Sequence, residues 1–161
     1  MPSDNELFTL HRYFLWAHRR VNEFFSRGAS LGMPPTEPTE RQRWTRANFV
    51  NLAPWLGSLY VVIEGWKELR MSDSEIDLML KSDKIDSLRR FRNGVFHFHK
   101  SYFDDRFLEL FSADGVQWAL DIHKEFDRYF KVWFESQGYS IEFSSDTNGN
   151  LTTTVSTPPN D

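Results

Sequence analysis

Apolar residues at steps of three and four positions limit what this chain can fold into more than any other feature of its sequence. In the first such segment, from about residue 4 to residue 26, they are Leu7, Leu10, Phe14, Ala17, Val21 and Phe24. The same rhythm runs over residues 39–70, 83–103 and 114–138, with shorter helical stretches at 73–80 and 106–111. Because this spacing gathers side chains on one face of an α-helix, each segment is predicted to be an amphipathic helix. The chain is therefore expected to be all-α, a bundle of four to five helices around one core.

Glycine, proline and capping residues mark where these helices begin and end. Two Gly and three Pro between residues 28 and 39 cannot continue a helix, so this stretch is predicted to be a connecting loop. Pro54 lies inside the second helix, where it removes an amide donor and predicts a kink or a break. Capping boxes are expected at Thr39 with Gln42 and at Ser72 with Glu75, and caps at Asp83 and Asp114.

The last 23 residues have a different pattern. After Gly138, apolar residues alternate with polar ones on both sides of Asn148-Gly149, which is the strongest short signal for a β-hairpin turn. Residues 1–138 are thus predicted to be the helical domain, and residues 139–161 a tail that is either a small hairpin or disordered.

Length and composition limit the class of protein. A chain of 161 residues suits one domain with one core. It contains no cysteine, which excludes disulfides, cysteine nucleophiles and thiolate metal sites. The first residues lack the order of a signal peptide, and the longest apolar run, Leu59 to Ile63, is too short to span a bilayer. A soluble cytoplasmic protein without membrane contact is expected.

Three histidines lie on predicted helices outside the central segment. His11 and His18 share the polar side of the first helix with arginines, and they are expected on a solvated face. His123 lies within the apolar face of the last long helix. A core histidine with its hydrogen bonds satisfied is expected there, rather than a ligand.

The segment from residue 84 to residue 106 carries the strongest chemical signal. The whole chain has a net charge of −4, which argues against a simple basic nucleic-acid binder, yet this segment has six basic residues and only three acidic ones. Its helix is predicted to carry a core seam of Leu88, Phe91, Val95, Phe98 and Tyr102.

Helical geometry separates the polar residues of this segment. Arg92 and His99 fall on one flank of the seam, and Asn93 and His97 fall nearly opposite it. A joint site of Arg92 and His97 therefore needs either a distortion of the helix near Gly94 or a second subunit.

The stretch Arg92-Asn93-Gly94-Val95-Phe96-His97 resembles the R-x4-6-H motif of HEPN domains, in the variant where a polar residue follows the arginine. His99 satisfies the six-residue spacer of the same motif. The resemblance implies a helical bundle that dimerises, brings two motifs into one cleft and cuts RNA without a metal or cofactor. It also implies RNA, a second copy and an antitoxin-like protein as partners, in a toxin or defence role. Several members carry a tyrosine two residues after the motif histidine, where this chain has His99.

The chemistry of RNA cleavage fits these residue types. Histidine carries protons near neutral pH, and arginine offers a planar fork of donors to phosphate. We expect His97 to act as base or acid, Arg92 to bind the phosphate and Asn93 to orient the phosphate or His97. His99 is expected to be a second proton carrier or a substrate contact.

Supporting residues are expected around this motif. Glu64 is an acid in an apolar stretch, so it either points to solvent or holds one of the bases in place. Arg89, Arg90 and Lys100 are expected to attract the RNA backbone without sequence preference.

Two other hypotheses remain open. In the first, the chain is a non-catalytic helical dimer that binds a protein or nucleic acid, with Arg92 paired to an acid such as Glu64. In the second, His97 and His99 bind a metal together with Asp104 or Asp105, although histidines two residues apart diverge on a helix.

Overall fold

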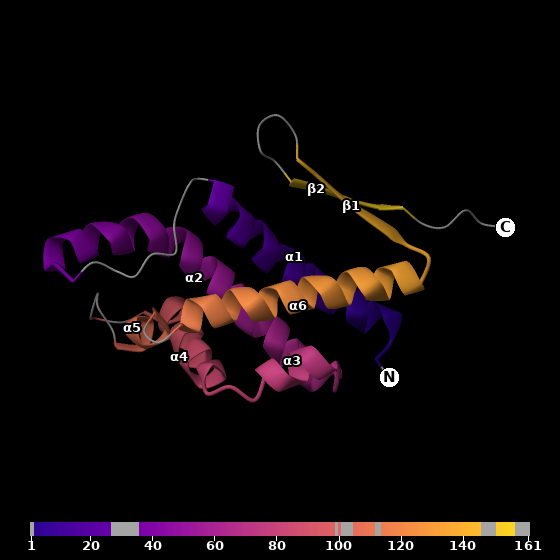
Figure 1. Cartoon of the computed structure of the whole chain (residues 1–161), viewed down its shortest axis with the longest axis horizontal. Coiled ribbons are helices and arrows are strands. Elements are labelled where there is room, and N and C mark those ends of the chain that lie inside the picture. Colours follow the sequence, from indigo (N-terminus) through magenta and orange to yellow (C-terminus); the bar gives the residue numbers. More distant parts are fainter. Residues whose placement is uncertain are drawn as a thin grey trace.

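Six helices and one β-hairpin make up the described part of this computed structural model, which covers residues 2–26, 36–98, 100, 105–111, 114–145 and 151–156. The elements are α1 (Asp4–Ser26), α2 (Pro38–Glu68), α3 (Ser74–Met79), α4 (Lys84–Phe96), α5 (Asp105–Phe111), α6 (Gly115–Ser136), β1 (Ser140–Ser145) and β2 (Leu151–Ser156). α1 packs along α2, α6 crosses both, and α4 lies beside α2 with α5 against it (Figure 1). The expected all-α bundle is confirmed.

Aromatic side chains from α1, α2, α4 and α6 fill the core. The largest side chains that are fully buried include Phe14, Phe24, Trp55, Trp66, Phe91, Phe126, Phe130 and Phe134. All six apolar positions predicted for the first helix are buried. Burying each large apolar side chain contributes about 1.5–3 kcal/mol, so this shared core fixes α4 against α2.

α2 begins before the predicted capping box and continues through its proline. Glu37 is the N-cap, since its carboxylate accepts a 2.7 Å hydrogen bond from the Glu40 amide, and Pro38 takes the first helical position. The capping box at Thr39 and Gln42 is therefore wrong. The helix is unbroken at Pro54, and its ribbon changes direction along its length (Figure 1).

The caps of the shorter helices also differ from the predicted ones. Asp73, and not Ser72, caps α3, because its carboxylate accepts hydrogen bonds from the amides of Glu75 and Ile76 at 3.1 and 3.2 Å. Ser72 instead donates its hydroxyl to Asp77. Asp83 and Asp114 do precede α4 and α6, but neither side chain makes a capping hydrogen bond.

α4 is shorter than predicted, and this changes the environment of the motif. It ends at Phe96, and His97 is already in an extended conformation. Leu88 and Phe91 are buried as predicted, but Phe98 is 92% exposed, so the seam is wrong beyond Val95. Tyr102 lies outside the described residues. The run of aromatic residues after Val95 has modest helix propensity, and no glycine follows to cap a longer helix.

Gly94 allows close packing of α5 on α4 and does not distort the helix. α4 continues for two residues beyond it. A Cβ atom at this position would lie 2.7 Å from Cε1 of Phe107 on α5. The absence of a side chain thus lets α5 pack closely on α4, and the first of the two alternatives for joining Arg92 and His97, a distortion near Gly94, is not found.

The hairpin predicted for the tail is present. β1 and β2 pair antiparallel, with Ile141 opposite Val155 and Phe143 opposite Thr153. Asn148 and Gly149, predicted to form the turn, lie outside the described residues. The hairpin follows the end of α6 and extends away from the bundle (Figure 1). Among the described helices, none combines the length and the apolar character needed to cross a membrane.

Candidate functional site

Arg92 lies on α4 where this helix packs against α2, and neighbours hold its guanidinium group on several sides. Nη1 donates a 3.0 Å hydrogen bond to Oδ1 of Asn93, and Nη2 lies 3.5 Å from Oε2 of Glu64. The guanidinium carbon is 5.9 Å from the centre of the Tyr60 ring. The side chain is half-buried, and its Nε atom is buried without a hydrogen-bond partner. Arg92 is therefore held in place while one donor stays unused.

The α2 side of this cluster is built from Tyr60 and Glu64, one helical turn apart. Tyr60 is buried, and burial, together with the charge of Glu64, raises the pKa of its hydroxyl, which stays protonated. Glu64 remains 45% exposed, so its long contact with Arg92 is a weak ion pair of about 0–1 kcal/mol. Loss of this ion pair would therefore cost little free energy.

His97 is the first residue after α4 and is exposed to solvent. Its backbone amide still donates to the carbonyl of Asn93 at 3.2 Å. The Asn93 side chain is engaged with Arg92. In one chain, therefore, Arg92 and His97 lie at the same end of α4, but Arg92 faces α2 and His97 faces solvent.

The other residues expected at this site have separate environments. Arg89 forms an ion pair with Asp86 at 2.7 Å, and Arg90 forms one with Glu109 at 2.9 Å. Lys100 is exposed. His99 lies outside the described residues. Two of the three cations expected to bind RNA are thus paired with acids, although such exposed pairs are weak and exchangeable.

A cavity of about 550 Å³ between α1 and α2 lies next to Glu64. Its lining also includes the carboxylates of Glu6 and Glu68 and the ring of Tyr13. Three carboxylates repel a phosphate backbone. An anionic ligand is therefore disfavoured in this cavity.

Exposed apolar side chains occur at the end of α4 and on α2. Phe96 is 58% exposed and packs over Gly57, where a Cβ atom would lie 2.6 Å from its ring. Val50 precedes Gly57 by seven residues, which places it on the same face of α2, and it is 70% exposed. Phe98 is 92% exposed, and Phe96 and Phe98 flank His97 in the sequence; the three exposed side chains Val50, Phe96 and Phe98 are together called the apolar surface.

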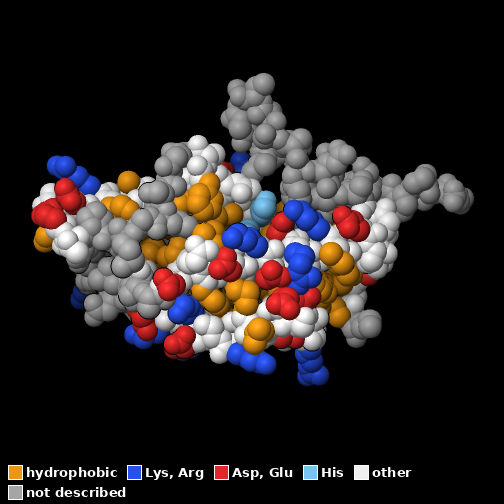
Figure 2. All heavy atoms as spheres, viewed as in Figure 1, with side chains coloured by type: hydrophobic (Ala, Val, Ile, Leu, Met, Phe, Trp, Pro, Cys, Tyr) orange, Lys and Arg blue, Asp and Glu red, His pale blue; other side chains and the backbone are white. Residues whose placement is uncertain are grey.

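The face seen in Figure 2 is not a uniformly basic surface. Lys and Arg side chains alternate there with Asp and Glu side chains, and histidine atoms are visible among them. On α6, Lys124 pairs with Asp121 and Arg128 with Glu125. This mixed charge does not favour a long RNA contact on that face.

Sequence reasoning missed a cluster of histidines in the core. Nδ1 of His18 lies 3.2 Å from Nε2 of His123, and the indole Nε1 of Trp55 donates to Nδ1 of His123 at 3.4 Å. The prediction that His123 is a satisfied core histidine is confirmed. The prediction of a solvated face is wrong for His11, which is only 5% exposed and packs against Phe130 and Phe134.

Burial keeps these histidines uncharged. It lowers the pKa of His11 to about 4 and that of His123 to about 3. It also lowers the pKa of the half-buried His18, against an opposing effect of Asp127. A neutral cluster of this kind stabilises the core and carries no charge for a ligand.

No group of three or more His, Asp or Glu side chains able to hold a metal ion occurs in the part of the chain that the structure describes. Two members of the alternative metal site, His99 and Asp104, lie outside it. Comparisons with models of protein families, with curated proteins and with solved structures found no match to this chain.

Proposed function

We propose that this chain is a metal-independent endoribonuclease of the HEPN type whose site is completed by a second copy. The observation that carries the proposal is the end of α4, where a half-buried arginine held by Tyr60, Glu64 and Asn93 is followed five residues later by an exposed histidine. Arginine and histidine are the two side chains that this chemistry needs.

The proposed reaction uses one histidine from each copy. His97 of one protomer takes the proton of the ribose 2′-hydroxyl, and the 2′-oxygen attacks the adjacent phosphorus. Arg92 exchanges its weak contact with Glu64 for the phosphate and stabilises the added negative charge. The bond from phosphorus to the 5′-oxygen breaks, and the partner's His97 donates a proton to that oxygen. The products are a 2′,3′-cyclic phosphate and a 5′-hydroxyl.

The apolar surface of Val50, Phe96 and Phe98 supports the dimer in this proposal, since it adjoins His97 and gains from being covered. A ribonuclease that needs no cofactor must be restrained in the cell. The proposal therefore includes an antitoxin-like protein partner, a toxin or defence role and a cytoplasmic location.

The test uses the purified full chain with labelled RNA in EDTA. The wild type should leave 2′,3′-cyclic phosphate ends, and Arg92→Ala and His97→Ala should each lower the rate by about 10²–10⁴-fold. Arg20→Ala is the matched control, because Arg20 is an exposed arginine that pairs with Glu23 on α1, far from α4 in the sequence. Cleavage at the wild-type rate in both site variants would sink the proposal.

A second candidate function is a non-catalytic dimer that binds a protein or nucleic-acid partner. It is favoured by the ion pairs that engage Arg89, Arg90 and Arg92 with neighbouring acids. RNA that is bound by the wild type and recovered intact would favour this function over cleavage.

A further inference from the structure

A second cavity, of about 550 Å³, lies at the other end of the bundle. None of the residues that line it belongs to α4. It is lined by residues from the start of α1, from the turn between α2 and α3, and from the last part of α6. The start of the chain lies beside α3 and α6 in Figure 1. Its volume falls within the usual range of small-molecule sites.

One wall of this cavity is aromatic. Tyr129 and Trp133 are four residues apart on α6 and therefore lie on one face of the helix. Both rings are partly exposed and make edge contacts with other rings, Tyr129 with Trp66 at 4.7 Å and Trp133 with Phe134 at 4.8 Å between ring centres. The wall thus offers two aromatic rings against which a flat ring can pack.

The opposite wall carries Arg70 in an unusual backbone conformation. Its φ angle is 52°, in the left-handed region, at the first position after the C-cap of α2. Glycine is the residue that normally occupies this position, since a side chain strains the backbone there. Within the described part of the chain, the Arg70 guanidinium forms no ion pair. The fold therefore accepts a strained arginine at the cavity without using its charge.

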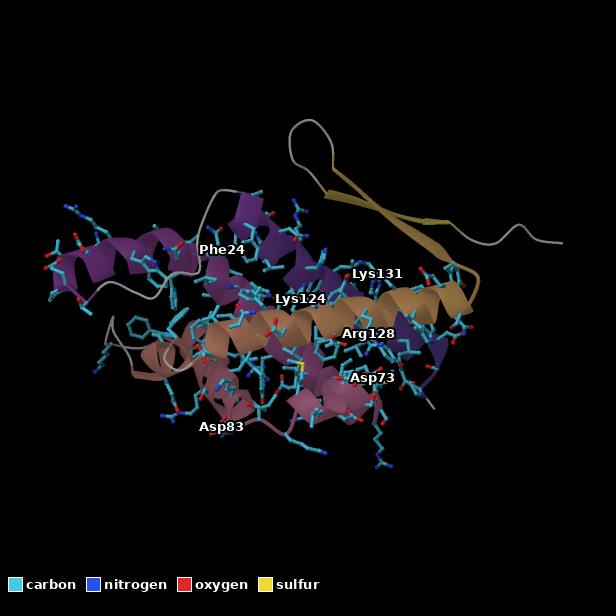
Figure 3. All side chains as sticks on the ribbon, in the orientation of Figure 1. Phe24, Asp73, Asp83, Lys124, Arg128 and Lys131 are labelled. Carbon is cyan, nitrogen blue, oxygen red and sulfur yellow. The ribbon has the colours of Figure 1, made fainter. Side chains whose placement is uncertain are left out.

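The turn that holds Arg70 is rigid. The amide of Met71 donates to the carbonyl of Trp66 at 3.0 Å, which closes the end of α2. Asp73 then pairs with Arg128 of α6 at 2.7 Å, and the two labelled side chains lie close to each other in Figure 3. The charged wall and the aromatic wall are thus linked and form the cavity before any ligand binds.

Other polar groups around the cavity can orient a ligand. The Tyr129 hydroxyl makes no hydrogen bond within the described residues, and burial raises its pKa, so it stays a donor. The carboxylate of Asp4 and the amide of Gln137 also line the cavity. Asp4 accepts a ring N–H and repels an anion, which directs negative charge toward Arg70.

We propose that this cavity binds a flat aromatic molecule that carries an anionic group and a ring N–H or amine, with its ring on Tyr129 and Trp133 and its charge on Arg70. A nucleotide and an aromatic carboxylate share this chemistry. The site is separate from the Arg92 motif and does not depend on the proposed cleavage of RNA.

The experiment is calorimetric titration of the full-length chain with adenosine 5′-monophosphate and, separately, with indole-3-acetate. At least one probe should bind with a Kd below about 1 mM. The matching compounds that lack the charge, adenosine and indole, and inorganic phosphate, which lacks the ring, should bind at least tenfold more weakly. Binding of the first probe identifies the nucleotide, and binding of the second identifies the carboxylate.

Arg70→Gly separates a binding role from a structural one. Glycine relieves the backbone strain, so Tm should stay the same or rise by about 2–4 °C, while affinity falls at least tenfold. Tyr129→Phe keeps the ring and should change affinity less than about threefold, whereas Arg12→Ala, a variant of an exposed arginine that lines neither cavity, should change nothing. Failure of both probes to bind the wild type, or equal affinity in Arg70→Gly, would overturn the proposal. RNA cleavage by Arg70→Gly should match the wild type, so the two proposals can fail separately.

Discussion

His18 and His123 join α1 to α6 through their ring nitrogens, 3.2 Å apart in the core. Because the indole of Trp55 can only donate, neutral His123 accepts at Nδ1 and carries its own proton on Nε2, which it donates to Nδ1 of His18. A further proton on either ring would place two N–H groups against each other. The network that ties three helices together therefore requires neutral histidines.

The first prediction is that acid destabilises the fold well before the carboxylates protonate. The unfolded chain binds protons on its histidines as the pH falls below about 6.5, whereas buried His11 and His123 resist protonation down to about 4 and about 3. Above about pH 7, these two histidines should therefore not change the unfolding free energy. Below about pH 6.5, each of them should lower the unfolding free energy by about 1.4 kcal/mol per pH unit. Urea unfolding at pH 7.5, 6.0 and 5.0 measures this loss.

A variant with one histidine fewer is the control for this pH dependence. His11→Leu removes one of the two strongly shifted groups, so the slope of unfolding free energy between pH 6 and 5 should fall by about 1.4 kcal/mol per pH unit. Carboxylates with a lowered pKa, such as those of Glu23 and Asp73, lose their contribution only at lower pH. An unfolding free energy that stays flat from pH 7.5 to 5.0 would contradict the buried neutral state.

The second prediction concerns the hydrogen bond between Trp55 and His123. His123→Leu leaves the buried indole N–H without its acceptor and should cost about 1–3 kcal/mol of unfolding free energy. Trp55→Phe removes the donor. A double-mutant cycle by urea unfolding should give a coupling of about 1 kcal/mol between the two changes. Strictly additive single effects would show that this 3.4 Å contact contributes nothing.

Residue spacing predicted the helices well because burial follows it directly. The burial of the six apolar residues of α1 follows from position alone, and the paired strands of the tail are one of the two alternatives that its pattern allows. The same spacing also indicates that His11 is buried, because it lies four residues after Leu7 and three before Phe14. Its polar side chain favours a solvated face, yet a neutral imidazole can be buried among aromatic rings, as it is here.

The end of α4 was not predictable from its apolar rhythm. The spacing that gives Leu88, Phe91 and Val95 continues through Phe98, yet the helix ends at Phe96. Where a helix ends depends on what its last turn packs against. Here the ring of Phe96 packs on Gly57 of α2, and the ring of Phe107 packs on Gly94. These contacts join residues far apart in the sequence, as does the contact of Arg92 with Tyr60.

The third prediction compares two glycines of the helices. Alanine normally stabilises a helix interior by about 1 kcal/mol relative to glycine. At Gly94 the new Cβ atom would press on Phe107, whose ring is held by Phe49 and Phe91, so Gly94→Ala should cost about 1–3 kcal/mol. At Gly57 the obstacle is the exposed ring of Phe96, which can swing aside.

Gly57→Ala is therefore the matched partner of Gly94→Ala, and it should be neutral or stabilising by up to about 1 kcal/mol. Thermal unfolding of both variants beside the wild type measures the difference. If Gly94→Ala proved as stable as Gly57→Ala, the close packing of α5 on α4 would not hold.

The fourth prediction tests whether the apolar surface of Val50, Phe96 and Phe98 is covered by a second copy. Phe98→Asp places a charge at the most exposed of these residues, 92% exposed in the single chain, so the single chain should keep its helical fold, as measured by circular dichroism. In a dimer the same carboxylate would be buried without a partner. Sedimentation should then show a monomer, and RNA cleavage should fall at least tenfold because the partner's His97 is no longer present.

Val132→Asp is the control for this last change. Val132 is a 56% exposed apolar residue on α6, outside the surface next to His97, so this variant should keep both the dimer and the cleavage rate. A Phe98→Asp variant that remains dimeric and active would show that copies do not meet at this surface. A variant that becomes monomeric yet cleaves RNA at the wild-type rate would show that one chain holds the whole site, with Arg92 and His97 acting together at the end of α4.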